Sequence, residues 1–214
     1  GRYSYRLSQK KVFVFASKIM IRVLSGKQKK IIEIISKNKL ICDNFYLTGG
    51  TALAEFYLRH RLSEDLDFFS EKEFEPQAVS VFFEKIKKEA GIKKVEFQQS
   101  FNRNLFFLEL SDGDKIKTEF TYFPFERIDK KNKMGNLQID SLLDIAVNKI
   151  FTIYQKPRSR DYIDLYFILQ KHENLLIDEL VKKAQIKFDN HIDPIQLGAQ
   201  YIKVKEVKDY PKML

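Results

Sequence analysis

The stretch LTGGTALAEFYLRHRLSEDLDFFS, which runs from Leu47 to Ser70, places a glycine pair, an apolar helix and two aspartates close together in the chain. The residues just before the glycines, 45–47, read as a short buried strand. Gly49-Gly50 then allows the backbone to turn sharply at a point where side chains would obstruct a ligand. This order of elements is typical of a turn that binds a phosphate group.

An apolar helix over residues 52–59 follows the glycine pair, and either Thr48 or Thr51 can cap it. Its first N–H groups and the positive end of its dipole would then face the turn. After the helix, residues 65–69 alternate between polar and apolar, as a half-buried strand does. Asp65 and Asp67 therefore project to the same face, where two adjacent carboxylates repel each other unless a divalent cation lies between them.

The composition indicates a globular protein that prefers anionic partners. Of 214 residues, 44% are apolar and 19 are Phe, which excludes a disordered chain. Lys and Arg number 38 against 29 acidic residues, so the net charge is +9. This excess favours nucleic acid ahead of a membrane, because no segment pairs a basic face with a clean apolar one. The alternative is that a lysine-rich chain simply has a lysine-rich surface.

The single cysteine, Cys42, excludes an internal disulfide and a cysteine-based zinc site, and it fits a reducing compartment. No apolar run approaches the roughly 18 residues that a membrane span needs. The N-terminus lacks the pattern of a signal peptide. We therefore expect a cytoplasmic protein with no membrane partner.

Outside the opening stretch, the first half of the chain carries further helix and strand signals. Ser25 is an N-cap candidate for one helix, and Pro76 and Gly91 suit the first turn and the C-cap of another. Three strand-like runs follow, over 95–101, 105–110 and 115–123, and their short separators predict consecutive antiparallel hairpins. Residues 10–23 mix basic and apolar residues and are interpreted as a short strand and helix.

Glu119 lies in the middle of the third run, on its polar face. If that strand lies beside residues 65–69, Glu119 can approach Asp65 and Asp67 as a third acidic group. Its side chain would then be a candidate third ligand of the same cation.

The polar, lysine-rich segment from Pro124 to Gly135 is the best candidate for a domain boundary. Beyond it the strand-like runs stop, and the pattern predicts four helices, over 141–155, 160–172, 175–188 and 194–207. We therefore expect an α+β domain over residues 1–130 and a helical C-terminal domain over 131–214. The fold class is α+β, with a mixed sheet and flanking helices.

Two of these helices place charged groups where packing alone would not. Lys149 falls on the edge of an apolar stripe, so its ammonium group is expected to enter a groove. In RDYIDLYFIL, Asp161 and Asp164 share one face of an otherwise apolar helix. Enclosed carboxylates need cationic partners, and Lys149, Arg158 and Arg160 are the nearby candidates. The competing interpretation is a purely structural ion pair, with Asp161 as a helix cap.

Together these motifs resemble the AbiEii/AbiGii toxin family of nucleotidyltransferases, within the DNA polymerase β-like superfamily. The resemblance spans about 47–169 and rests on Gly-Gly-Thr before an apolar helix, on His60-Arg61-x-Ser63-x-Asp65-Leu66-Asp67, on the downstream lysine and on Arg160-Asp161-x-x-Asp164-Leu165. It implies a polymerase β-like minimal nucleotidyltransferase core and a helical domain that closes a basic cleft over it. It also implies Mg²⁺-dependent transfer of a nucleoside monophosphate from an NTP, with Mn²⁺ as a possible replacement, to tRNA or another RNA, and a cognate antitoxin.

The resemblance also assigns roles to residues. Gly49, Gly50 and Thr51 match the phosphate-contacting turn, and Ser63, Asp65 and Asp67 match the motif that holds metal and triphosphate. Lys149 matches a lysine that faces the phosphates. The family's essential aspartate in the RDYIDL segment is Asp161 or Asp164, and we favour Asp164 because it sits deeper in the apolar run. The family's third metal-side acid is an aspartate in many members, whereas the candidate here is Glu119.

Several questions stay open from sequence. The proton of the acceptor hydroxyl could pass to Asp67 or Glu119, or metal coordination could suffice. Two other functions compete: a non-catalytic module that binds nucleotide, RNA or an antitoxin, and a glycosyltransferase that uses the same carboxylate pair. Arg61 is placed to meet a phosphate or to pair with Asp65, and His60 is a surface or capping residue or a ligand. The lysines at 130, 131 and 133 are the first choice for RNA backbone contact.

Overall fold

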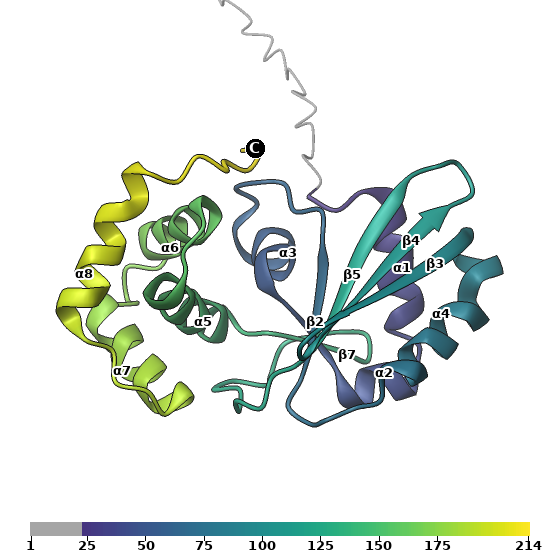
Figure 1. The fold of residues 1–214 in the computed structure, drawn as a ribbon, viewed down its shortest axis with the longest axis horizontal. Coiled ribbons are helices and arrows are strands. Elements are labelled where there is room, and N and C mark those ends of the chain that lie inside the picture. The colour runs from purple at the N-terminus through teal and green to yellow at the C-terminus, as the bar shows by residue number, and fades with distance from the viewer. Residues whose placement is uncertain (1–22) are drawn as a thin grey trace, which may run out of the picture.

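The sheet that organises the protein runs in the order β3-β4-β5-β2-β1-β7-β6 (Figure 1). The computed structural model describes residues 23–214, so the expectation for residues 10–22 lies outside the described part of the chain. The strands are β1 (Tyr46–Thr48), β2 (Leu66–Ser70), β3 (Ile92–Ser100), β4 (Arg103–Leu110), β5 (Lys115–Tyr122), β6 (Lys133–Met134) and β7 (Leu137–Ile139).

Strand pairing at the centre of the sheet brings the acidic residues together. Strand β2 runs antiparallel to β1 and parallel to β5. In these registers Asp67 lies opposite Thr48 on one side and opposite Glu119 on the other. The expected neighbourhood of Glu119 and the second aspartate is therefore confirmed. Strands β3, β4 and β5 form the predicted antiparallel meander.

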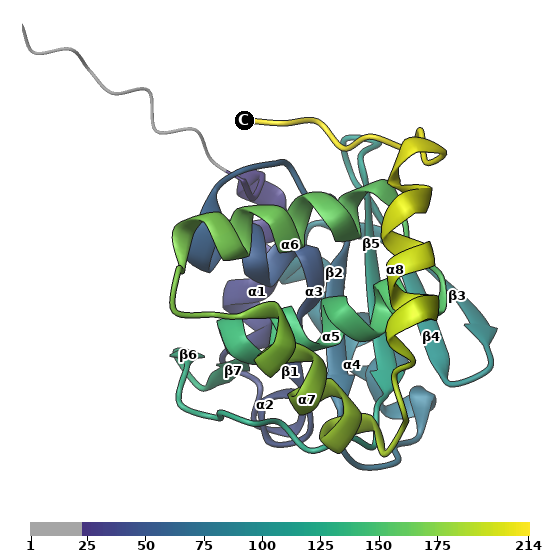
Figure 2. The same ribbon diagram turned by 90° about the vertical axis from the view of Figure 1, so that its left-hand side faces the viewer.

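Helices cover both faces of the sheet (Figures 1 and 2). In Figure 1 the helices to the right of the sheet are α1 (Gly26–Ile35), α2 (Lys39–Asn44) and α4 (Pro76–Ala90). Those to the left are α3 (Gly49–Leu53), α5 (Leu142–Gln155), α6 (Ser159–Lys171), α7 (Ile177–Phe188) and α8 (Pro194–Ile202), which ends in a 3₁₀ turn over Lys203–Lys205. Among residues 23–214, no helix is both long enough and apolar enough to cross a membrane.

The predicted helix ends are confirmed at α1 and α4. Ser25 and Gln28 form a reciprocal capping box at the start of α1. Pro76 occupies the first turn of α4, and Gly91 ends it with a φ of 74°, a left-handed conformation that glycine adopts without steric cost. The four C-terminal helices also lie where the sequence places them, within a few residues at each end.

Aromatic side chains join the layers. Phe68 on β2 and Phe120 on β5 stack with ring centroids 4.8 Å apart, and Phe83 of α4 meets Phe120 edge to face. On the other side, Phe151 of α5 stacks on Phe188 of α7 at 3.9 Å. The first cluster fixes α4 to the sheet, and the second fixes α7 to α5.

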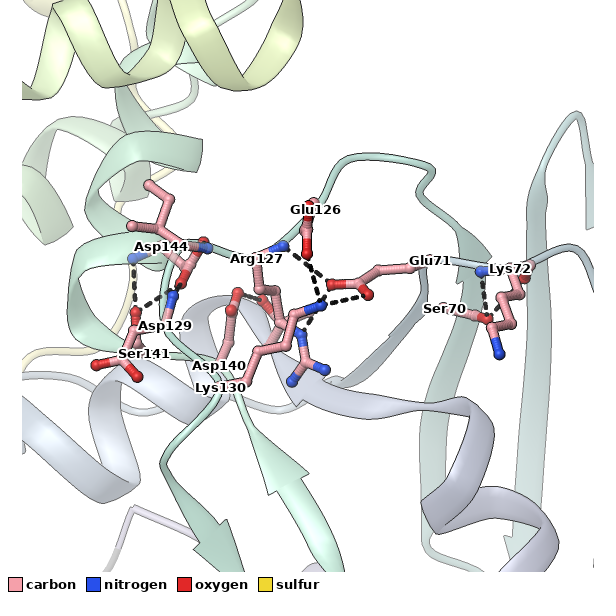
Figure 3. Close-up of polar contacts among 12 residues, drawn as sticks. Ser70, Glu71, Lys72, Glu126, Arg127, Asp129, Lys130, Asp140, Ser141 and Asp144 are labelled. Atoms are coloured by element: carbon pink, nitrogen blue, oxygen red, sulfur yellow. Dashed lines mark hydrogen bonds and ion pairs between the residues drawn. The ribbon is translucent and has the colours of Figure 1, made fainter.

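Asp144 connects the C-terminal helices to the segment that leaves the sheet (Figure 3). Its buried carboxylate accepts hydrogen bonds from the backbone N–H groups of Ile128 and Asp129, at 2.8 and 3.0 Å, and from the Ser141 hydroxyl. The Lys187 ammonium lies 2.8 Å away. Burial alone would raise the pKa of Asp144, but the Lys187 charge and these hydrogen bonds hold it below its usual value.

Two expectations about element bounds were wrong. The helix after the glycine pair begins at Gly49, not at residue 52, and continues from Ala54 to Leu58 as a π-helix. Strands also continue past residue 130, because β7 pairs in parallel with β1. At three residues, β7 is too short for alternation to reveal it. The sheet thus extends to Ile139, and the division at residue 130 into two domains stays a prediction.

Candidate active site

A cavity of about 640 Å³ opens between the central strands and helices α5 and α6. Most of the residues singled out from sequence line it: Gly49, Gly50, Arg61, Ser63, Asp65, Asp67, Glu119, Lys149 and Asp161. Thr51 and Asp164 lie behind its wall and contact residues that line it. The fold therefore brings two stretches that are about a hundred residues apart to one place, while the roles of these residues stay predictions.

The glycine pair permits two close approaches. Gly49 has a φ of 71°, and a Cβ there would lie 2.5 Å from Oδ2 of Asp67. A Cβ on Gly50 would overlap Nη2 of Arg61. Any larger residue would therefore displace either the carboxylate or the guanidinium from the turn.

The two threonines do not cap the helix through their side chains as expected. Thr48 occupies the N-cap position, but its hydroxyl donates to Oδ2 of buried Asp140 at 2.6 Å. The Thr51 hydroxyl lies 2.7 Å from Oγ of Ser63 and donates to the backbone carbonyl of Asp65. Thr51 therefore fixes the segment that leads into β2, and Asp140 fixes the residue that precedes the glycines.

The three acidic residues have different partners. Asp65 lies 2.8 Å from the Lys117 ammonium, and Glu119 accepts two hydrogen bonds from Arg103, at 2.7 and 2.6 Å. Burial would raise the pKa of Glu119, but the Arg103 pair lowers it below its usual value. Asp67 lacks such a pair, and burial, followed by the charges of Glu119 and Asp65, raises its pKa to about 6.

These carboxylates fit a hard divalent cation that is shared with a phosphate ligand. Within the described residues, no group of three or more His, Cys, Asp or Glu side chains is arranged to hold a metal ion alone. Mg²⁺, however, usually takes one or two protein carboxylates and completes its shell with water and substrate phosphates. Asp65 and Asp67 supply that number, and no hydrogen bond from residues 23–214 occupies the Asp67 carboxylate. Asp65 is paired with Lys117 and Glu119 with Arg103, so each pair would have to open for its carboxylate to bind a cation, and a third ligand at Glu119 stays a prediction.

The opposite wall is a buried ion network. The Lys149 ammonium lies 2.7 Å from Asp161 and 2.6 Å from Asp164, which confirms that it enters the interior with these carboxylates. Asp164 is fully buried and also binds His60 at 2.8 Å and both Nε and Nη2 of Arg61. Of the two roles expected of Arg61, the pair with Asp65 was wrong, because the bend after the π-helix directs Arg61 to α6, and the contact with a phosphate stays a prediction. Arg158 pairs with Asp161 as expected.

Sequence reasoning missed the cations on the sheet side of the cavity. Lys117 stands two residues before Glu119 on β5, so the alternation that places the acid also places this lysine. Arg103 reaches Glu119 from the neighbouring strand β4, and that pairing depends on a register no local pattern reveals. Arg160, named from sequence as a carboxylate partner, lines the cavity without an ion pair among residues 23–214.

Comparison with known proteins decides the family. Residues 37–209 match the family described as "Nucleotidyl transferase AbiEii toxin, Type IV TA system". The chain belongs to this AbiEii family. The resemblance seen in its motifs is thereby confirmed, and the family and fold support a transferase. The AbiEii match covers both walls of the cavity.

Three further proteins resemble the chain in sequence or in fold. A protein of Aquifex aeolicus (strain VF5), named "Uncharacterized protein aq_aa25", is 34% identical over 175 residues, which cover 79% of each chain. The Helicobacter pylori protein JHP933 has 21% identity and a TM-score of 0.53 over 84% of this chain and 91% of its own. A second structure from that organism, assigned by name to the nucleotidyltransferases, has 19% identity and a TM-score of 0.55 over 87% and 86%. These two structures support the α+β fold alone.

Proposed function

We propose that this protein transfers a nucleoside monophosphate from an NTP to an RNA acceptor, with tRNA as the first candidate, in a reaction that depends on Mg²⁺. The proposal rests on one observation, that acidic and basic candidate residues lie on opposite walls of a single cavity. Asp65 and Asp67 lie on one side, Lys149 lies on the other, and the Gly49-Gly50 turn lies between them.

The chain's own groups suit a triphosphate. The glycine pair lets Asp67 and Arg61 approach the turn closely, so both groups stand beside backbone N–H groups that can receive phosphate oxygens. Arg61 and Lys149, held by Asp164, present positive charge where pyrophosphate would leave. A bound Mg²⁺ would neutralise the triphosphate and orient its α-phosphate. Asp65 and Asp67 would hold that ion, and Glu119 could join them only after Arg103 turns away.

The acceptor must lose a proton from its hydroxyl group. Asp67 and Glu119 are the two candidates that line the cavity. Asp67 is the better candidate, because no ion pair with residues 23–214 holds it. Glu119 accepts two charged hydrogen bonds from Arg103 and is a weaker base as a result.

An RNA acceptor fits the charge of the cavity mouth. Arg103, Lys117, Arg158 and Arg160 all line the cavity, and the chain as a whole carries a net charge of +9. Cations arranged around a cleft attract and orient a polyanion. The family's description as a toxin of a toxin–antitoxin system supports an antitoxin as a second partner.

The direct test is to incubate purified protein with total tRNA, Mg²⁺ and each α-³²P-labelled NTP separately. We expect label on tRNA from at least one NTP and none with Asp65→Asn or Asp67→Asn, at unchanged thermal stability of the fold. Asp178→Asn is the matched control, because Asp178 is an exposed aspartate of α7 that does not line the cavity. Label that persists at full level in both cavity variants would refute the mechanism.

The same experiment separates the competing functions. A glycosyltransferase would leave the α-phosphate on its released nucleotide, so tRNA or any other acceptor would stay unlabelled. A non-catalytic binding module would bind tRNA without labelling it. In that case expression would be harmless to growth, and the aspartate variants would behave as the wild type does.

A further inference from the structure

A second cavity, of about 570 Å³, lies at the other end of β1 and shares no lining residue with the first. It is bounded by α2, by the β6–β7 hairpin and by the segment that carries Arg127. Tyr46 lines this cavity and Thr48 lines the catalytic one.

Two buried hydrogen-bond donors on residues that line this cavity have no partner among residues 23–214. They are the hydroxyl of Tyr46 and Nη1 of Arg127. Tyr46 is only 2% exposed. Burial, followed by the charge of Asp140, raises its pKa above the usual value, so the hydroxyl keeps its proton and can donate. Buried polar atoms are nearly always paired, and two unpaired donors on residues of one cavity indicate an absent acceptor.

The charges around the cavity favour an anion as that partner. Lys39, Lys72 and Lys133 line it together with Arg127, and none of the three lysines makes an ion pair within the described residues. Two acidic residues also line it, Asp43 and Glu71. Glu71 is already neutralised, because it pairs with Arg127 at 3.2 Å and with Lys130 at 3.0 Å. Four cations against two carboxylates leave the lining with a net positive charge.

Arg127 presents its guanidinium in a binding orientation. The group lies over the Tyr46 ring, 4.1 Å from the centroid, and Nε and the backbone N–H both donate to Glu71. In Figure 3 the terminal nitrogens point away from Glu71. A guanidinium that is fixed on one side and free on the other matches the paired oxygens of a phosphate.

We propose that this cavity is a second anion site, which binds a phosphate group through Tyr46, Arg127 and Lys133. One source of the phosphate is the backbone of the RNA acceptor, in which case the inference rests on the proposed function. The other source is a free phosphate compound. The chemistry of recognition is the same in both cases, so binding experiments distinguish them.

Two variants each remove one proposed phosphate contact and should leave the fold intact. Tyr46→Phe deletes a hydroxyl that makes no hydrogen bond with residues 23–214, so the melting temperature should not fall. Lys133→Ala removes one exposed charge from the rim. Lys88→Ala is the matched control, because it removes one exposed charge from α4, outside both cavities.

Binding is measured without metal or NTP, by anisotropy of labelled tRNA at fixed ionic strength, and for inorganic phosphate by the rise in melting temperature relative to chloride. We expect Tyr46→Phe to weaken binding about tenfold, as befits a lost hydrogen bond to a charged group. Lys133→Ala should reduce the slope of log affinity against log salt by about one, and Lys88→Ala should leave it nearer the wild-type value.

Weaker tRNA binding in both variants, with Lys88→Ala close to wild type, establishes RNA as the source. A loss confined to the phosphate-induced stabilisation establishes a free phosphate compound. If both variants match Lys88→Ala with tRNA and with phosphate, the second site is refuted. Refutation of the second site does not affect the proposed function, which is tested separately by the labelling of tRNA by wild-type protein. If wild-type protein labels no tRNA, the proposed function fails, and the phosphate measurement still tests the second site.

Discussion

Asp164 joins Arg61 through two parallel hydrogen bonds, Nε to Oδ1 at 2.6 Å and Nη2 to Oδ2 at 2.9 Å, although the residues lie 103 positions apart. The same carboxylate binds Lys149 and His60 and has no exposed surface. Burial opposes its ionisation, but Lys149 and then Arg61 and His60 hold the pKa of Asp164 well below its usual value. Asp164 thus fixes the cations of the site and does not itself line the cavity.

This arrangement predicts that Asn substitutions at the two aspartates of α6 lower the folding stability by different amounts. Asp164→Asn leaves Arg61 and Lys149 buried with a neutral partner, and breaking such a network costs about 3 to 5 kcal/mol of folding stability. Asp161→Asn should cost less, because Lys149 keeps Asp164 and the half-exposed Arg158 can reach water. Urea unfolding measures both. Equal destabilisation by the two variants would show that Asp164 is not the centre of the network.

The glycine turn supplies a second prediction. Gly50→Ala places a methyl group where Nη2 of Arg61 lies, so Arg61 must move and its bonds to Asp164 must distort. We expect lower stability and loss of nucleotide transfer. Gly198→Ala, in the interior of α8 with open space around it, should instead raise stability by about 0.5 to 1 kcal/mol and leave transfer unchanged. Transfer at the wild-type rate in Gly50→Ala would contradict the proposed role of the close approach.

The ion pair between Arg103 and Glu119 predicts how substitution of each acidic residue changes metal binding. With a non-hydrolysable NTP analogue present, Mg²⁺ should raise the melting temperature of the wild type, since a ligand stabilises the state that binds it. Asp67→Asn should abolish this rise. Glu119→Gln should retain most of this rise, because Arg103, and not a metal ion, is paired with the Glu119 carboxylate. A Glu119→Gln variant that responds as weakly as Asp67→Asn would make Glu119 a third ligand.

The parts of the fold that sequence predicted are those with local causes. Helix α4 is bounded by Pro76 and Gly91, whose backbone preferences act at their own positions. The meander follows from short turns, and the carboxylate pair from alternation along one strand. Each of these signals lies within one short segment of the chain.

The parts that sequence missed depend on contacts between distant segments. A pair with its neighbour Asp65 was one of the two roles expected of Arg61, whereas the fold offers it the fully buried carboxylate of Asp164. Arg103 reaches Glu119 only because of the β4–β5 register. The Thr48–Asp140 bond spans 92 positions, and nothing in the local pattern around either residue indicates it. Ion pairs and buried hydrogen bonds follow the three-dimensional arrangement, and local periodicity does not determine that arrangement.

Asp140 provides a prediction about pH. Its carboxyl group has no exposed surface, accepts from Thr48 through Oδ2 and has no partner at Oδ1 among residues 23–214. Burial, followed by the charge of Asp144, raises its pKa to about 7. The native state therefore binds this proton more tightly than the unfolded state, whose aspartates titrate near pH 3.9. Its contribution to stability is fully present below about pH 4 and is lost as the pH rises through about 7.

Asp140→Asn removes this dependence while it keeps an acceptor for the Thr48 hydroxyl. We expect the variant to match the wild type near pH 4 and to exceed its free energy of unfolding by about 1 to 4 kcal/mol at pH 8, since each pKa unit corresponds to about 1.4 kcal/mol. Urea unfolding at pH 5, 6, 7 and 8 gives the difference directly. Because Thr48 directly precedes Gly49, nucleotide transfer by the same samples tests whether the bond also positions the turn. A stability difference that stays constant across this pH range would show that Asp140 does not titrate there.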